Sequence, residues 1–167
     1  MTPLIRAAKA EDVPALNAIY GHYVTDCTCT WEEQDKELFT REGLARRASI
    51  YPVLVAEVDG RVLGWASLSP YNTRTGWRYV AENSVFIDHR CHGQGLGKAL
   101  LGALLARAKA SPIRKVIARI SGDQPGSLGL HRSLGYQEAG RLREAGFKSG
   151  KWLDCVYMER DLAPAQP

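Results

Sequence analysis

Apolar residues recur at two different spacings along the chain, and the longer spacing marks the helices. One set recurs every three or four residues, as on one face of an α-helix, and comprises Val13, Leu16, Ile19, Tyr20 and Tyr23. A second set has the same spacing and comprises Leu96, Leu100, Leu101, Leu104, Leu105 and Ala108. A weaker helical pattern spans residues 36–48, and residues 125–134 form a short helix that Gly135 ends. The pattern therefore predicts four helices.

Short apolar or β-branched runs mark the strands. Residues 53–56 and 62–66 flank an Asp59-Gly60 turn, which is a strong signal of a β-hairpin. Further runs at 5–8, 83–87, 116–120 and 152–158 predict four more strands. Because strands and helices are mixed, with a strand–turn–helix–strand unit near the middle of the chain, the pattern predicts an α/β fold.

Length and composition predict one globular domain. The 167 residues are 45% apolar and 24% charged, which argues against extensive disorder. We assign residues 1–162 to the domain and residues 163–167 to a frayed tail. No run approaches the roughly 20 apolar residues that span a bilayer, and the N-terminus lacks the apolar core of a signal peptide. A cytoplasmic protein with reduced cysteines is the default expectation, with no membrane partner.

Charge excludes one class of partner. The net charge is +4, without a run of five or six basic residues and without a basic stripe interleaved with aromatics. We therefore expect no nucleic-acid partner. A small positive excess suits an anionic small molecule.

Two groups of cysteines and histidines raise the question of a metal site. Cys27-x-Cys29 lies near His22, and Cys91 stands between His89 and His92. Nothing in the sequence completes a four-ligand set with either group, so we expect no metal.

A glycine-rich turn carries the strongest signal in the chain. It reads His92-Gly93-Gln94-Gly95-Leu96-Gly97-Lys98 and lies between a predicted strand and a predicted helix. Glycines let the backbone adopt positive φ and approach a ligand, and the helix start offers unpaired N–H groups to phosphates. A tight turn without a ligand is the alternative, but three glycines at alternate positions exceed what a turn needs.

Two nucleotide-binding motifs do not fit this turn. A dinucleotide fingerprint requires a third glycine where Lys98 stands. A Walker loop requires four residues between its glycines and a hydroxyl after its lysine, whereas three residues separate Gly93 from Gly97 and Ala99 follows Lys98.

The turn resembles the pyrophosphate loop of the GNAT superfamily of acetyl-CoA-dependent N-acetyltransferases. That loop reads Arg/Gln-x-x-Gly-x-Gly/Ala, and His92-x-x-Gly95-x-Gly97 fits except at its first position. Residues 123–136 resemble the family's second cofactor-contacting helix, with Gln124 in place of the usual Asn and His131 in place of a frequent Tyr. With residues 81–85 and 146–154, the chain resembles the phosphinothricin and methionine-sulfone acetyltransferase group from Ile5 to Met158.

The resemblance implies a fold and a cosubstrate. It implies a mixed, mostly antiparallel sheet flanked by helices, with a V-shaped cleft for acetyl-CoA, and a homodimer. The implied cofactor-binding residues are Val85, Phe86, Ile87, His92, Gly93, Gln94, Gly95, Leu96, Gly97, Lys98, Gln124 and Ser127. For Gln124 and Ser127, helix capping is the alternative role.

The resemblance also implies the chemistry, which is direct acetyl transfer to an amine without a covalent enzyme intermediate. An acceptor amine arrives mostly as an ammonium ion and must lose a proton, directly or through water, before it attacks the thioester. Glu82 is the implied base, and a strand-end carboxylate in a salt bridge is its alternative role. His131 is the implied partner of the leaving thiolate or a second base, and a packed histidine is its alternative role.

The acceptor implied by the resemblance is a small amino acid with a phosphinate or sulfone-like side chain. Its contacts fall in an N-terminal loop and in an aromatic- and arginine-rich loop, and comprise Trp31, Tyr71, Arg74, Trp77 and Tyr79. Arg74 matches the arginine that binds the acidic end of the substrate in that group. Lys148 and Trp152 are expected in the pocket or in a dimer contact. A peptide N-acetyltransferase and a non-catalytic acyl-CoA sensor are the rival functions.

Overall fold

The computed structural model describes residues 2–34 and 37–162, so the predicted tail at 163–167 lies outside the described residues. A seven-stranded sheet in the order β1-β2-β3-β4-β5-β7-β6 runs through it. Its strands are β1 (Leu4–Ala7), β2 (Val53–Val58), β3 (Arg61–Pro70), β4 (Val80–Ile87), β5 (Lys115–Ser121), β6 (Gln137–Lys148) and β7 (Lys151–Asp161). All neighbouring strands are antiparallel except β4 and β5, which are parallel.

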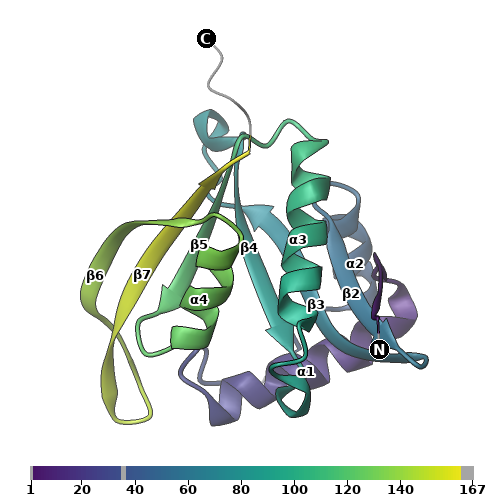
Figure 1. Cartoon of the computed structure of the whole chain (residues 1–167), viewed down its shortest axis with the longest axis horizontal. Helices are drawn as coiled ribbons and strands as arrows, with labels where there is room; N and C mark the ends of the chain where they lie inside the picture. The colour runs from purple at the N-terminus through teal and green to yellow at the C-terminus, as the bar shows by residue number, and fades with distance from the viewer. Residues whose placement is uncertain (1, 35–36, 163–167) are drawn as a thin grey trace.

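Helices cover both faces of this sheet, with α3 and α4 toward the viewer and α1 and α2 behind it (Figure 1). The α-helices of the described residues are α1 (Val13–Asp26), α2 (Arg41–Ala48), α3 (Leu96–Lys109) and α4 (Pro125–Ser133). Short 3-10 turns are η1 (Ala10–Asp12), η2 (Thr75–Trp77) and η3 (His89–Cys91). The expected mixed, mostly antiparallel sheet flanked by helices is confirmed.

Alternation along the strands divides the core in two. In β2, Leu54 and Ala56 pack with α3, while Val53 and Val55 pack with α1 and α2. This is the period of two that a pleated strand imposes, and it explains why the middle of β2 is a continuous apolar run rather than an alternating one. Trp65 of β3 is fully buried against α1, and its ring N–H donates to the Leu16 carbonyl at 3.2 Å.

Two predicted elements begin three or more residues away from their expected starts. The helix expected from residue 36 begins at Arg41, because the Thr40 side chain accepts the Gly43 N–H at 3.0 Å and caps it there. Residue 36 itself lies outside the described residues. The strand expected from residue 83 begins at Val80, so Glu82 lies inside β4 rather than before it.

The sequence pattern missed β6. This strand pairs with β7 at the edge of the sheet, and almost all of its side chains are exposed. Without a buried face it has no alternating apolar pattern, so only its pairing with β7 identifies it as a strand.

Candidate active site between β4 and β5

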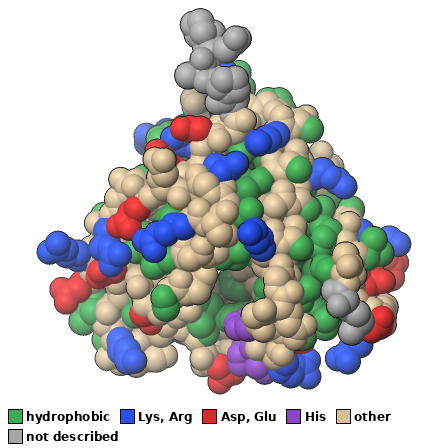
Figure 2. Space-filling model, in the orientation of Figure 1, with side chains coloured by type: hydrophobic (Ala, Val, Ile, Leu, Met, Phe, Trp, Pro, Cys, Tyr) green, Lys and Arg blue, Asp and Glu red, His purple; other side chains and the backbone are tan. Residues whose placement is uncertain are grey.

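The sheet opens into a cleft where its two parallel strands separate. β4 and β5 pair at three positions, of which Glu82 with Ile117 is the last, and both strands continue beyond this point without pairing. A cavity of about 760 Å³ lies there, lined by both strands and by residues of α1, α3 and α4. Figure 2 shows a hollow with hydrophobic side chains on this face of the molecule. The separated strand edges leave backbone N–H and C=O groups available to a ligand.

The glycine turn forms one end of the cleft. Gly93 and Gly95 have φ of 76° and 80°, and nothing lies within 4 Å of a Cβ built on either. Glycine is therefore required here by backbone conformation rather than by lack of space. Gly95 is the N-cap of α3, so the first N–H groups of this helix point to the cleft without helical partners. A Cβ on Gly97 would lie 3.2 Å from Leu130, which shows how closely α3 and α4 approach each other.

His92, the departure from the family pattern, is tied to α1. The Tyr23 hydroxyl lies 2.5 Å from the Ile87 carbonyl and 2.6 Å from His92 Nε2. A carbonyl only accepts, so Tyr23 donates its proton to Ile87 and His92 donates to Tyr23. Burial raises the pKa of Tyr23, which keeps the hydroxyl protonated. The imidazole therefore helps to anchor the turn, beside its expected role toward phosphate.

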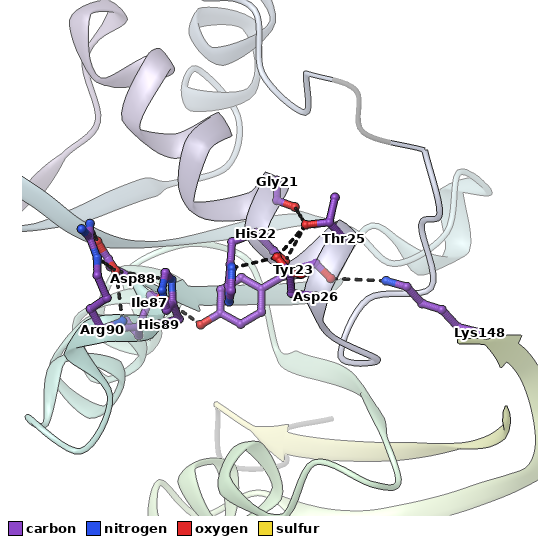
Figure 3. A network of polar contacts seen from close by, with 10 residues as sticks. All are labelled: Gly21, His22, Tyr23, Thr25, Asp26, Ile87, Asp88, His89, Arg90 and Lys148. Carbon is purple, nitrogen blue, oxygen red and sulfur yellow. Dashed lines mark hydrogen bonds and ion pairs between the residues drawn. The ribbon is translucent and has the colours of Figure 1, made fainter. Parts of the chain in front are cut away.

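A polar network joins α1 to the segment that leads into the turn (Figure 3). The His22 and His89 rings stack at 3.8 Å, and His22 Nδ1 lies 3.2 Å from the Asp26 carboxylate. The Arg90 side chain contacts Asp88 at 2.6 Å and lowers the pKa of that carboxyl to about 2. These contacts fix η3, and with it the entry into the glycine turn.

Lys148, expected near the pocket or a dimer contact, is a buried structural link. Its ammonium group donates to the carbonyls of Tyr23 at 3.3 Å and Thr30 at 2.8 Å, so it connects β6 with the end of α1 and the loop that follows. Trp152, named with it, is exposed and packs against Phe147 at a ring separation of 5.2 Å.

Glu82 lies where the two strands part, and an arginine contacts it. Its neighbour Ala81 packs with α3, so Glu82 faces the other side of the sheet. Arg119 of β5 donates from Nε at 2.7 Å and from Nη2 at 2.9 Å to its two carboxylate oxygens. The Glu82 carboxylate raises the pKa of Arg119. Glu82 therefore makes the salt bridge of its alternative role, and this contact leaves its expected role as the base open.

His131 lies in a buried chain of hydrogen bonds. Tyr136 donates to Asn83 Oδ1 at 2.9 Å, Asn83 Nδ2 lies 3.0 Å from His131 Nε2, and His131 Nδ1 lies 2.8 Å from the Ser127 carbonyl. Because Ser127 offers an acceptor and Asn83 a donor, the neutral ring carries its proton on Nδ1. Burial lowers the pKa of His131, which favours this neutral form.

The two expected cofactor contacts on α4 both lie at the cleft. Gln124 is the N-cap residue of α4, but its side chain makes no capping bond and instead donates to Thr28 at 3.0 Å. Ser127 lines the cleft one turn before His131. Capping by the Gln124 side chain, the alternative role, is therefore not observed.

The cleft brings together most of the expected site residues. Those that line it are Trp31, Glu82, Val85, Phe86, Ile87, His92, Gly93, Gly95, Leu96, Gly97, Lys98, Gln124, Ser127 and His131. The expected residues outside its lining are Gln94, Tyr71, Arg74, Trp77 and Tyr79. Tyr71 and Trp77 pack against each other at 5.1 Å, and Arg74 is exposed.

Sequence reasoning missed three residues that shape the site. Tyr23 and Asn83 gave no signal, because an aromatic on a helix face and an amide in a strand are common. Arg119 did give one, since a cation interrupts the apolar run of β5. Only the cleft explains that cation, because the side chain is exposed there rather than buried.

Two further features of the described residues bear on function. Across residues 2–34 and 37–162, no three His, Cys, Asp or Glu side chains are grouped so that they could hold a metal ion. No helix in these ranges is both long and apolar enough to cross a membrane.

Comparison with known proteins places the cleft in a family. Residues 16–136 match the acetyltransferase (GNAT) family. The chain is 41% identical to a phosphinothricin N-acetyltransferase of Alcaligenes faecalis over 95% of this chain and 82% of the relative. It is 37% identical to an L-methionine sulfoximine/L-methionine sulfone acetyltransferase of Pseudomonas aeruginosa over 99% of this chain and 98% of the relative.

A solved structure agrees over the whole length. A Salmonella typhimurium acetyltransferase structure with its cofactor acetyl-CoA has a TM-score of 0.92 and 33% identity, and the match covers 100% of this chain and 98% of that one. The resemblance read from the glycine turn and from residues 123–136 is confirmed. The chain belongs to the GNAT family of acetyltransferases.

Proposed function

We propose that this protein transfers an acetyl group from acetyl-CoA to the α-amino group of a small amino acid. The acceptor class is that of phosphinothricin and of methionine sulfone or sulfoximine, which the names of the two relatives support. One observation carries the proposal: a single cleft joins the glycine turn at the start of α3 to the Glu82 carboxylate where β4 and β5 separate.

The cleft fits acetyl-CoA. The left-handed glycines 93 and 95 leave room for a phosphate, and the start of α3 presents N–H groups and a positive dipole end to it. The free edge of β4 at Val85, Phe86 and Ile87 offers backbone groups to an extended amide-containing arm. The remaining contacts proposed are His92, Gln94, Leu96, Gly97, Lys98, Gln124 and Ser127. When bound, acetyl-CoA supplies an acetyl thioester.

Glu82 is the proposed base. It lies on the face of the sheet opposite α3 and α4 and lines the cleft, so an amine that enters the cleft from the α1 side can reach this carboxylate. A carboxylate that accepts two hydrogen bonds retains further lone pairs, and one of these can take the ammonium proton directly or through a water.

For His131 the proposal is a positioning role. Its Nε2 accepts from Asn83 and carries no proton in the neutral form, so it has none to give a thiolate there. His131 instead holds the side-chain amide of Asn83, the residue that follows Glu82 in β4. We therefore expect His131→Gln to lower kcat without changing the pH profile of kcat, whereas the loss of one limb of that profile would show a proton transfer instead.

The acceptor contacts proposed are Trp31, which lines the cleft, and the loop that carries Tyr71, Arg74, Trp77 and Tyr79. This loop follows β3, whose residue Ser69 also lines the cleft. Ser69 is the register partner of Glu82, and the Tyr71 N–H donates to the Val80 carbonyl at 3.3 Å. The start of the loop is therefore close to the Glu82 side of the sheet.

A homodimer and a cytoplasmic location belong to the same proposal. Exposed apolar side chains on the β6–β7 edge, Leu142, Phe147 and Trp152, support the dimer. Light scattering after size exclusion measures it directly, and a mass of one chain at micromolar concentration would rule it out.

The test is thiol release from acetyl-CoA across a panel of amines. Phosphinothricin, methionine sulfone and methionine sulfoximine should react, and Glu82→Gln should lower kcat by about 10²-fold or more while acetyl-CoA binding is kept. Glu138→Gln, outside the cleft, is the matched control. Turnover of peptides alone would identify a peptide acetyltransferase, and acetyl-CoA binding without any turnover would identify a sensor.

A further inference from the structure

Arg119 places a cation within the apolar run of a central strand. It lies in β5 between Ala118 and Ile120, which are both buried in the core on the α3 side. Its own side chain points to the opposite face, lines the cleft and is 53% exposed. An apolar side chain at this half-exposed position would cover the cleft floor as well, so the charge calls for an explanation in what the cleft binds.

The guanidinium and the Glu82 carboxylate form a matched pair of opposite charges. Both Nε and Nη2 of Arg119 donate, one to each oxygen of Glu82, so the two planar groups face each other edge to edge. Glu82 belongs to the last β4–β5 pair, opposite Ile117, and Arg119 lies two residues beyond Ile117, so the ion pair stands where the two strands begin to separate. A negative and a positive group are therefore held in contact at the point where an acceptor must place its amine.

An α-amino acid presents the complementary pair. Its ammonium and carboxylate groups are attached to one carbon, so its positive and negative charges are also adjacent. If Glu82 receives the ammonium group, the guanidinium beside it is the nearest partner for the carboxylate on the same carbon. A guanidinium fork suits this role because it binds a carboxylate through two parallel hydrogen bonds and stays charged throughout the physiological pH range.

We propose that Arg119 binds the α-carboxylate of the acceptor, so that Glu82 and Arg119 together recognise the zwitterionic head of an α-amino acid. This inference rests on the proposed function and adds a specificity residue to it. Arg74, by contrast, is assigned to the acidic end of the substrate side chain. In the free protein the two charges satisfy each other, and the acceptor exchanges this ion pair for two new ones. The chain then selects free α-amino acids over amines that lack a carboxylate.

The test compares methionine sulfone with its α-carboxamide, which keeps the amine and the side chain but lacks the negative charge. The kcat/KM ratio of acid to amide is measured in the wild type, Arg119→Met and Arg119→Lys. Arg132→Met, which removes an exposed arginine of α4 outside the cleft, is the matched control. Because the amine pKa differs between acid and amide in the same way for every variant, the change in the ratio isolates the carboxylate contact.

We expect Arg119→Met to lower the acid-to-amide ratio by about tenfold or more, mainly through KM for the acid, as for a lost charge-assisted double hydrogen bond. Arg119→Lys should keep part of the preference, and Arg132→Met all of it. An unchanged ratio in Arg119→Met would overturn the inference. An equal loss with acid and amide would also overturn it, since Arg119 would then act only by placing Glu82.

The two proposals fail in different ways. A wild type that acetylates neither methionine sulfone nor its amide refutes the proposed function and this inference with it. A wild type that acetylates both, with a ratio that does not respond to Arg119, refutes the inference alone. Thermal unfolding of Arg119→Met shows that the variant folds, and Arg119→Lys carries the comparison if it does not.

Discussion

Removing the Tyr136 hydroxyl tests the buried chain that holds His131. Tyr136 is only 3% exposed, its hydroxyl donates to Asn83 Oδ1 at 2.9 Å, and its ring packs edge-on against His131 at 4.9 Å. The change Tyr136→Phe keeps the ring and its packing but takes away the donor. Burial raises the pKa of Tyr136, so the hydroxyl is protonated and donates at neutral pH.

The expected loss of stability follows from the Asn83 carbonyl oxygen, which the substitution leaves without its donor. Asn83 is itself only 7% exposed, so little of it is open to water as a replacement donor. A buried acceptor left without a partner costs about 1–3 kcal/mol. For a chain of this size, that corresponds to a fall in Tm of roughly 2–12 °C.

The assay is urea unfolding followed by tryptophan fluorescence, with circular dichroism as a second probe. Tyr79→Phe, at an exposed tyrosine, is the matched control and should change the free energy of unfolding by less than about 0.5 kcal/mol. A loss in Tyr136→Phe no larger than that of the control would refute the reasoning. It would mean that Asn83 is satisfied by water and that His131 is not held in one tautomer by this chain.

Three further predictions concern the acceptor pocket, the buried histidine and the turn. A Cβ on Gly146 would lie 2.6 Å from Cδ2 of Trp31, so Gly146→Ala should displace that ring. Steady-state kinetics should show a higher KM for the acceptor and an unchanged KM for acetyl-CoA. Two unchanged KM values would contradict this prediction. Burial lowers the pKa of His131, so as the pH falls through the unfolded-state value near 6.5 the unfolded chain binds a proton that the native state excludes. The free energy of unfolding should then fall by up to about 1.4 kcal/mol per pH unit until the native pKa is reached, and urea unfolding of His131→Gln should show a smaller slope than the wild type. Gly95→Ala should lower the free energy of unfolding by about 1–2 kcal/mol, because φ is 80° at this position. Calorimetry should also show weaker acetyl-CoA binding. Wild-type stability and affinity in this variant would show that the turn relaxes without cost.

The turn and α4 could be predicted because their chemistry is local. The residues from His92 to Lys98 form one continuous segment, and the positive φ of Gly93 and Gly95 is a property of that segment alone. His131 was found in the same way, within the segment that begins at Asp123. Signals of this kind depend only on neighbouring residues, so they can be recognised without knowing which strands pair.

Partnerships between distant residues could not be predicted in this way. Glu82 was identified, but its contact with Arg119 joins positions 37 residues apart, and the sequence contains no rule that pairs them. Tyr23 and His92 are separated by 69 positions and meet only because α1 crosses the end of β4. The tautomer of His131 likewise depends on Asn83, which is 48 positions away.

The sequence by itself determined the helices, most strands, the glycine turn and the family, because periodicity and short motifs act over a few residues and need no partner. The tertiary structure alone decided that β6 is a strand, that β4 and β5 part after Glu82, and that a carboxylate and a guanidinium meet there. Strand pairing and ion pairing depend on which segments are brought together in space. That choice is made by burial of the whole core, so no single stretch of sequence contains it.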